Sequence, residues 1–372
     1  MTLTLAAVPA RAAGPTCFGI RATIVGTNAA DALFGTSGRD VISAGAGADT
    51  IVGKGSGDLI CGGQGADKVK AGSGSDAIRG GAGADRLIAG PGSDEIKGGP
   101  GADMLELGRG ADYSGVGGRG ADVIYGGEGD DVLGVANSGG GGGNYSYTEA
   151  RVFADPGNDT YRGGPGKDTL GFSEGNDVLN GGPDRDEASY YNPRREAAPF
   201  YVNLSAGTSS GLGRDRISRV ENLTAFGLNS IFLVGDGRRN HLVGSTSADG
   251  SGVATFQGKR GPDLIITVPG SNLGEAGPAR FSGGTGKDVL EGGCTEIPAV
   301  TNVMRGGRGS DRLDGSCGPD ALFGNAGDDR LFGHAENDSL DGGSGSNTND
   351  GGFGSDRCVD PTISEGARHC EA

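Results

Sequence analysis

The chain has 372 residues, and its 80 glycines and 15 prolines make up about a quarter of them, while tryptophan is absent. The formal net charge is −16, from 48 acidic and 32 basic side chains. The scarcity of large apolar side chains disfavours an ordinary globular enzyme, and the negative charge argues against nucleic acid and anionic membranes as partners and favours cations.

The N-terminal residues 1–13 resemble the tail of a secretory signal. A short apolar stretch leads to Ala10-Arg11-Ala12, which places small residues at a cleavage site. The alternative is an Ala-rich terminus with no targeting role. We expect residues 14–25 to form an N-terminal cap and the protein to be secreted and extracellular.

Aspartate recurs with a period of nine residues through the first third of the chain. The series runs from Asp31 to Asp112 without a miss and resumes, after one inserted residue, with Asp122 and Asp131. An apolar residue stands two positions after almost every one of these aspartates, and Ser114 is the exception. Regular spacing of this kind is typical of a repeat architecture.

Glycine placement defines the repeat further. Residues 62–67 read Gly-Gly-Gln-Gly-Ala-Asp, and the same pattern, G-G-x-G-x-D, ends at Asp85, Asp103, Asp122, Asp131, Asp168, Asp288, Asp311 and Asp356. Together with the apolar position, it resembles the RTX, or haemolysin-type, calcium-binding nonapeptide repeat. Recognisable units cover residues 26–133, 154–188, 258–290 and 306–358. The resemblance implies a right-handed parallel β-roll that binds Ca²⁺, as in secreted bacterial proteins.

The residue types in the repeat account for such a fold. Six residues form a tight turn, in which glycine tolerates positive φ angles best. The next three alternate polar and apolar side chains and have strand character. The full Gly-Gly pair returns in every second repeat, before Asp67, Asp85 and Asp103, so two repeats form one coil with a turn at each edge. We predict an all-β solenoid, in which the edge with the full Gly-Gly pairs binds metal more regularly.

Stacked coils place carboxylates above one another, about 4.8 Å apart. Such a pair repels by roughly 1 kcal/mol in water, and by about 3.5 kcal/mol at an effective dielectric of 20, unless a cation lies between the coils. Carboxylate and carbonyl oxygens in compliant turns suit calcium better than magnesium. We expect several Ca²⁺ ions, up to about eight between Asp31 and Asp112, and calcium-dependent folding. The predicted metal ligands are Asp40, Asp49, Asp58, Asp67, Asp76, Asp85, Asp94, Asp103, Asp112, Asp122, Asp131, Asp159, Asp168, Asp177, Asp288, Asp311, Asp320, Asp329 and Asp338.

The segments expected after the N-terminal cap differ in how well they keep the repeat. They are the regular roll at 26–133, a Gly-rich surface loop at 134–153, further repeats at 154–188, metal-poor spacer coils at 189–257, repeats at 258–357 and a C-terminal cap at 358–372. The spacer lacks the aspartates but keeps strand-like pieces. We expect the solenoid to continue through it without metal; a separate globular domain is the alternative.

The six cysteines form an even set without a C-x-x-C pair. This pattern favours a disulfide framework in an oxidising compartment over a zinc site. Sequence proximity suggests Cys17 with Cys61, Cys294 with Cys317 and Cys358 with Cys370, although six cysteines allow fifteen pairings. Six free thiols are the alternative.

The sequence offers no catalytic motif. His241, His334 and His369 are isolated, and neither H-E-x-x-H nor G-x-S-x-G occurs. No run of 18 apolar residues is present, so membrane insertion is not expected. We expect a calcium-binding protein with a structural or binding role and no enzymatic activity.

An extracellular enzyme acting on polysaccharide is the alternative function. The spacer gathers aromatic and basic side chains to which a carbohydrate or a protein partner would bind, namely Tyr190, Tyr191, Arg194, Arg195, Phe200 and Tyr201. Packing within an irregular spacer is the simpler interpretation of the same residues.

Overall fold

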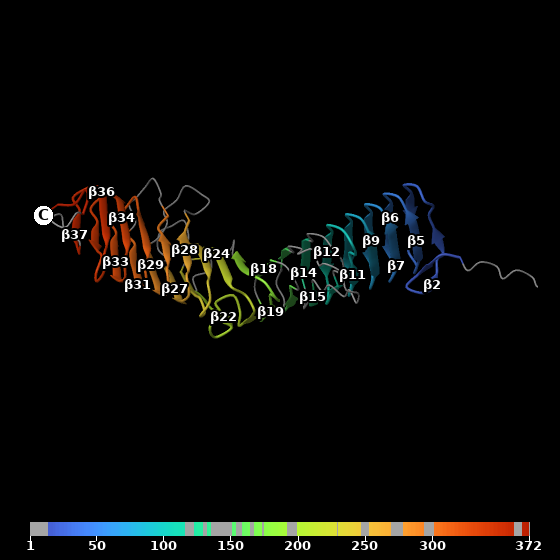
Figure 1. Ribbon diagram of the computed structural model, residues 1–372. Helices are drawn as coiled ribbons and strands as arrows, with labels where there is room; N and C mark the ends of the chain where they lie inside the picture. Colours follow the sequence, from blue (N-terminus) through green and yellow to red (C-terminus); the bar gives the residue numbers. More distant parts are fainter. Residues whose placement is uncertain are drawn as a thin grey trace, which may run out of the picture. The chain divides into compact units, whose positions relative to one another are not determined.

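The computed structural model describes residues 14–115, 123–128, 132–134, 151–153, 158–163, 167–172, 175–191, 199–228, 230–246, 253–268, 278–293, 301–360 and 367–371. The chain forms two compact units, Met1–Asp122 (unit 1) and Val123–Ala372 (unit 2). All regular elements in the described ranges are β-strands (Figure 1). Within these ranges no helix has the length and apolarity needed to cross a membrane.

Unit 1 consists of two parallel sheets and a short antiparallel pair at its N-terminal end. The pair is β1 (Thr16–Cys17) with β2 (Ile20–Arg21). One sheet contains, in order, β4 (Ala32–Phe34), β6 (Thr50–Gly55), β8 (Lys68–Ser73), β10 (Arg86–Pro91) and β12 (Met104–Arg109). The other contains β3 (Ile24–Val25), β5 (Val41–Ala46), β7 (Leu59–Gln64), β9 (Ala77–Ala82), β11 (Glu95–Lys97) and β13 (Tyr113–Gly115).

In the two parallel sheets of unit 1, each strand pairs with the strand two repeats away. Ile60 of β7 lies beside Ile78 of β9, and Leu87 of β10 lies beside Leu105 of β12. The apolar residue two positions after each aspartate therefore stacks on its equivalents in the neighbouring coils, and these side chains are buried except for the half-buried Leu33 in the first coil. Ser114 occupies the same position, and its buried hydroxyl has no hydrogen-bond partner. The register confirms the predicted parallel β-roll with two nonapeptides per coil.

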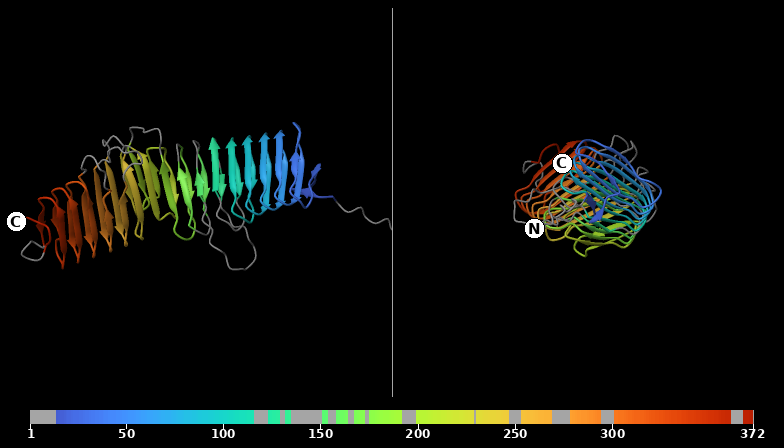
Figure 2. Two further views of the ribbon diagram at one scale, coloured as in Figure 1. Left: turned by 90° about the horizontal axis from the view of Figure 1, so that it is seen from above. Right: turned by 90° about the vertical axis from the view of Figure 1, so that its right-hand side faces the viewer.

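Unit 2 has the same two-sheet pattern, with its own strands stacked in chain order (Figure 2). One sheet contains β14 (Val123–Glu128), β16 (Arg151–Phe153), β18 (Thr169–Phe172), β20 (Glu187–Tyr191), β24 (Asn222–Leu228), β26 (His241–Thr246), β28 (Leu264–Thr267), β30 (Val289–Glu291), β32 (Arg312–Ser316), β34 (Arg330–Ala335) and β36 (Thr348–Phe353). The other contains β15 (Val132–Gly134), β17 (Thr160–Arg162), β19 (Val178–Asn180), β21 (Phe200–Asn203), β22 (Thr208–Ser210), β23 (Arg216–Ser218), β25 (Ile231–Val234), β27 (Ala254–Arg260), β29 (Ala279–Thr285), β31 (Val303–Arg308), β33 (Ala321–Ala326), β35 (Ser339–Asp341) and β37 (Arg357–Val359).

The strands of the aspartate-poor segment 189–257 are built into these sheets. β24 pairs in parallel with β20 on one side and β26 on the other, and β25 lies in parallel between β21 and β27. Only β22 departs from the pattern among the described strands here, because it pairs antiparallel with β21 and β23. The coils of this segment therefore stack on the repeats of unit 2.

Two members of the aromatic group of the spacer pack inside the roll. Tyr190 and Phe200 are fully buried, with ring centroids 4.4 Å apart. Tyr201 is partly exposed and contacts the ring of Phe232. The described part of this group therefore favours the packing interpretation over a carbohydrate site; Arg194 lies outside the described residues.

Disulfides join the ends of the roll to the nearby coils. Cys17 bonds Cys61 in β7, and Cys358 in β37 bonds Cys370, which confirms two of the suggested pairs. Cys317 is also disulfide-bonded. Its suggested partner, Cys294, lies outside the described residues. So do the signal-like residues 1–13 and most of the Gly-rich insertion.

Candidate metal centre

The repeat aspartates form ladders of buried carboxylates along both edges of the roll. Along each ladder, Oδ1 of one aspartate accepts a hydrogen bond from the backbone N–H of the equivalent residue one coil earlier. The distance is 2.9 Å from Asp67 N to Asp85 Oδ1 on one edge and 2.8 Å from Asp76 N to Asp94 Oδ1 on the other. The two edges of unit 1 therefore have the same carboxylate geometry, and the predicted difference in metal binding between them stays a prediction.

A glycine five positions before the aspartate leaves room for the carboxylate. A Cβ built on Gly80 would lie less than 3.0 Å from both Asp85 Oδ2 and the carbonyl oxygen of Gly98. Gly62 has the same relation to Asp67 and to the carbonyl oxygen of Gly80. Carboxylate and carbonyl oxygens thus converge beside each of these glycines, which explains the first glycine of the hexad.

The residue four positions before the aspartate sets the direction of the turn. In most repeats it has a positive φ, for example 123° at Gly81. Lys54, Lys259, Asn325 and His334 occupy this position with φ values of 93°, 83°, 74° and 82°. A positive φ is costly for residues with side chains. Its presence at four such positions indicates that the turn geometry is imposed by the repeat.

We call a turn open when it has this positive φ and the second carboxylate oxygen, Oδ2, is buried without a hydrogen-bond partner. A buried carboxylate oxygen with no partner is strongly unfavourable unless a cation or a proton is added. Open turns end at Asp49, Asp58, Asp67, Asp76, Asp85, Asp94, Asp186, Asp263, Asp288, Asp311, Asp329, Asp338 and Asp356.

Burial also changes the acidity of the open-turn carboxylates. Desolvation, with a smaller contribution from neighbouring carboxylates, raises the pKa of Asp85, Asp94, Asp263, Asp311 and Asp338 to about 7. The backbone N–H that each receives lowers the pKa only in part. The metal-free ladder therefore disfavours its own ionised state, which a bound divalent cation would favour.

The donor set fits calcium. Within the described ranges, no three or more His, Cys, Asp or Glu side chains come together as a metal cluster. A cation at an open turn would therefore take carboxylate oxygens singly from stacked turns and complete its shell with backbone carbonyls. Calcium accepts six to eight such oxygens in irregular geometry, whereas zinc prefers nitrogen and sulfur, and magnesium needs a regular octahedron.

A second class of turn supplies its own donors to the carboxylate. Oδ2 of Asp40 accepts hydrogen bonds from Thr36 N at 2.6 Å and Thr36 Oγ1 at 3.0 Å. Ser316 donates in the same way to Asp320, at 2.5 and 3.0 Å. Thr27 does so for Asp31. We call these turns capped, because a hydroxyl residue replaces the second glycine and occupies Oδ2.

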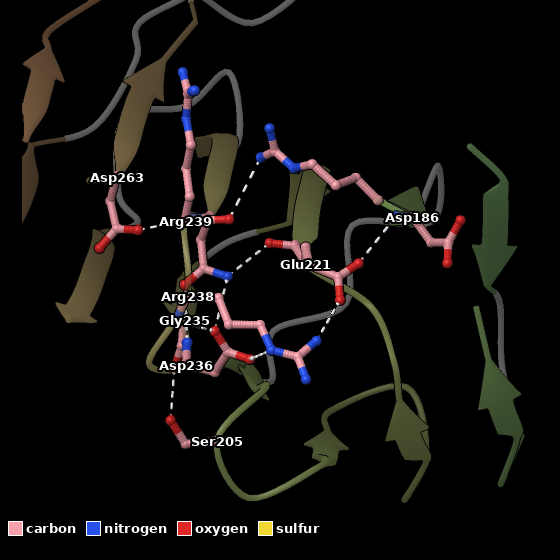
Figure 3. Close-up of polar contacts among 10 residues, drawn as sticks. Asp186, Ser205, Glu221, Gly235, Asp236, Arg238, Arg239 and Asp263 are labelled. Carbon is pink, nitrogen blue, oxygen red and sulfur yellow. Dashed lines mark hydrogen bonds and ion pairs between the residues drawn. The ribbon is translucent and has the colours of Figure 1, made fainter. Parts of the chain in front are cut away.

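In one coil of the spacer, an arginine side chain supplies the positive charge beside the ladder carboxylate (Figure 3). Glu221 takes the place of the ladder aspartate and accepts a hydrogen bond from Asp186 N at 3.1 Å through Oε2. The guanidinium of Arg238 donates to Glu221 Oε1 at 2.8 Å. Asn240 follows in the ladder and donates from Nδ2 to the Glu221 carbonyl at 2.8 Å. In this coil, the Glu221–Arg238 ion pair and the Asn240 amide therefore take the place of the ladder aspartates.

The predicted ligands fall into several groups in the structure. Ten of them end open turns: Asp49, Asp58, Asp67, Asp76, Asp85, Asp94, Asp288, Asp311, Asp329 and Asp338. Asp103, Asp112 and Asp177 accept the ladder hydrogen bond, and the backbone N–H of Asp168 donates one to Asp186 Oδ1. Asp40 and Asp320 end capped turns, and Asp159 accepts from the Tyr161 hydroxyl. Asp122 and Asp131 lie outside the described residues.

Three open-turn aspartates are absent from the predicted set. Asp186 is preceded by Pro183 and Arg185 in an atypical hexad, and Asp356 ends the last unit. The hexad that ends at Asp263 lacks the full pattern, because Lys259 stands at the second glycine position. A sequence signal is present for two of them, because a glycine stands five positions before the aspartate, Gly258 before Asp263 and Gly181 before Asp186. Each of these glycines makes room for Oδ2 of its aspartate.

The histidines have separate surroundings. The ring of His334 lies 3.4 Å from Asp314, and His369 Nδ1 lies 2.6 Å from Asp350. His241 lies in a groove with basic residues. The described contacts therefore place each histidine in a different part of unit 2.

One family model matches the chain repeatedly. Its description is RTX calcium-binding nonapeptide repeat (4 copies), and it matches residues 25–60, 53–87, 61–96, 79–113, 115–134, 151–170, 173–188, 301–329 and 323–358. Together these matches cover more than half of the chain. No curated protein matches the sequence.

Proposed function

The chain belongs to the RTX calcium-binding nonapeptide-repeat family, and we propose that calcium bound at its open turns folds it into a rigid extracellular solenoid with a structural or binding role. The observation that carries this proposal is the series of buried Oδ2 atoms without hydrogen-bond partners, repeated from coil to coil at open turns.

Calcium would act chiefly as a folding ligand. Each coil buries little more than one apolar side chain per strand, such as Ile60 and Val69, against the backbone entropy of ordering a whole coil. When a metal binds only the folded state, its binding free energy adds to the stability of that state. The residues that would hold it are the open-turn aspartates and the carbonyls of the stacked turns, as at Asp85 and Gly98.

The location outside the cell is supported by the cysteines. Disulfides such as Cys17–Cys61 persist in oxidising compartments. Extracellular calcium-binding modules have dissociation constants of about 10⁻⁴ to 10⁻³ M. A chain with sites of this class would stay loose in the calcium-poor interior of the cell and fold after export.

Far-UV circular dichroism of the purified chain, titrated with calcium after chelation, tests this function. We expect a cooperative gain of β-signal at millimolar calcium, whereas magnesium at the same concentration produces little change. A chain that is already fully folded in chelator, and whose unfolding is indifferent to calcium, contradicts the proposal.

A further inference from the structure

A groove on unit 2 gathers basic side chains in a chain that is acidic overall. Its volume is about 170 Å³, and Lys167, Arg185, Arg239 and His241 line it together with Asn222 and Leu264. None of the described residues in its lining is acidic. Local positive charge on a protein with a net charge of −16 attracts anions against the general field of the molecule.

The basic residues occupy a repeat position that does not need a base. Each of Lys167, Arg185 and Arg239 stands directly before a ladder residue, and each is exposed. In unit 1, the equivalent exposed position before β6, β8, β10 and β12 is a small neutral residue, namely Ala48, Ala66, Ala84 and Ala102, whereas Arg39 stands at the other edge. Because alanine serves the same turn, folding does not account for three cations at neighbouring positions.

The polar groups in the groove retain hydrogen-bonding capacity. Arg185 Nη2 donates to Asn222 Oδ1 at 3.3 Å and to the Arg239 carbonyl at 3.4 Å. Both distances are long for hydrogen bonds, and the guanidinium has five N–H donors. His241 Nε2 is buried and has no hydrogen-bond partner among the described residues. A ligand with several acceptor oxygens would satisfy these groups.

The neighbouring acidic side chains limit where an anion would sit. Glu187 and Glu291 lie close enough to His241 to affect its charge. The positive side of the groove is therefore the turn side, where Lys167, Arg185 and Arg239 stand. Guanidinium groups bind planar and tetrahedral oxyanions through charge-assisted hydrogen bonds.

We propose that this groove binds an oxyanion group, carboxylate, sulfate or phosphate, carried by a small molecule or a single sugar unit. Its volume is smaller than the roughly 300–1,000 Å³ of pockets for drug-sized ligands, so it fits one charged group and a small carrier. Leu264 offers an apolar contact for the carrier, and the Asn222 amide offers a further polar one.

Isothermal titration calorimetry of the calcium-loaded full chain tests the proposal. The probes are glucose 6-sulfate, glucose 6-phosphate and galacturonate, with glucose as the neutral comparison. We expect at least one anionic probe to bind with a millimolar or lower Kd, more weakly as salt is added. The probe that binds most tightly identifies which oxyanion the groove prefers.

The double variant Arg185→Gln/Arg239→Gln is expected to weaken binding at least tenfold, and the exposed Arg330→Gln of β34 changes it less than twofold. Circular dichroism and calcium titration show whether the variants fold. If the double variant does not fold, the exposed Lys167→Gln serves instead and should weaken binding severalfold. Absence of binding up to about 10 mM, equal binding of glucose, or equal loss in Arg330→Gln overturns the proposal.

Discussion

The residue four positions before each aspartate decides how the carboxylate is used. With a positive φ, as at Gly81, it leaves Asp85 Oδ2 buried and without a partner. With a hydroxyl residue, as at Thr36, the carboxylate of Asp40 is already satisfied by an N–H and an O–H. Two turns of equal length thus differ in their need for a cation, because one has internal donors and the other has none.

This difference predicts unequal effects of two matched substitutions. Asp85→Asn keeps an oxygen for the Asp67 N–H but removes the charge, so we expect the calcium stoichiometry to fall and the affinity of the remaining adjacent sites to drop about tenfold or more. Asp40→Asn should leave the stoichiometry unchanged. Native mass spectrometry and calorimetry measure both. Equal losses in the two variants, or none in Asp85→Asn, would contradict the division into open and capped turns.

The sequence predicts the residue roles unevenly. The nine-residue period alone identifies the ladder and its apolar stack, because both repeat at fixed positions. The open turn at Asp263 is harder to recognise, since Lys259 adopts the positive φ that glycine signals elsewhere. The capping of Asp40 depends on where the Thr36 hydroxyl points, and spacing does not determine that.

At the scale of the ladder, acidity and calcium are expected to act in opposite directions. Burial raises the pKa of Asp85, Asp94, Asp263, Asp311 and Asp338 from 3.8 to about 7 in the metal-free fold. The folded state therefore binds protons at these carboxylates more tightly than the unfolded chain does. The stabilisation that this protonation gives the fold is complete below about pH 4 and is lost as the pH rises through 7.

We therefore expect the metal-free chain to keep more residual β-structure at pH 5 than at pH 8, and that structure to resist urea better. With calcium the order should reverse, because protons compete with the metal for the same carboxylates. Urea unfolding of chain freed of calcium on a chelating resin, at both pH values and with calcium restored, measures this. A metal-free chain that is more stable at pH 8 would show that the ladder carboxylates are not destabilised by burial.

The spacer coil at Glu221 is expected to behave differently from the open turns. Arg238→Gln removes the guanidinium that faces the buried Glu221 carboxylate, which should cost about 1.5–3 kcal/mol of stability. Because no metal is needed in this coil, the loss should be the same at every calcium concentration that folds the chain. Urea midpoints measure it, with Arg330→Gln as the control. A loss that disappears at high calcium would indicate that this coil also binds the metal.

The fold of these elements follows from the sequence more completely than their boundaries do. Stacking of every second repeat predicts the pairing of Ile60 with Ile78 directly. The longer spacing from Asp263 to Asp288 is accommodated while the ladder hydrogen bond stays at 2.8 Å. The antiparallel β22 has no signal in the period, because it arises from a local hairpin with β21.

At the scale of the whole molecule, both units share the same dependence. Open turns occur in unit 1, as at Asp67, and in unit 2, as at Asp311. The disulfides Cys17–Cys61 and Cys358–Cys370 tie terminal residues to nearby coils, where a solenoid has no further coil to protect its end. Calcium would then stabilise the repeats, while covalent bonds stabilise the ends.

The most direct measurement is anomalous scattering at long wavelength from crystals of the calcium-loaded chain. We expect peaks beside Oδ2 of open-turn aspartates, such as Asp67, Asp85 and Asp311, and none beside Asp40 or Glu221. Absence of peaks at the open turns would contradict the claim that calcium satisfies these buried carboxylates. Peaks of equal height beside Asp40 would contradict the role of the capping hydroxyl.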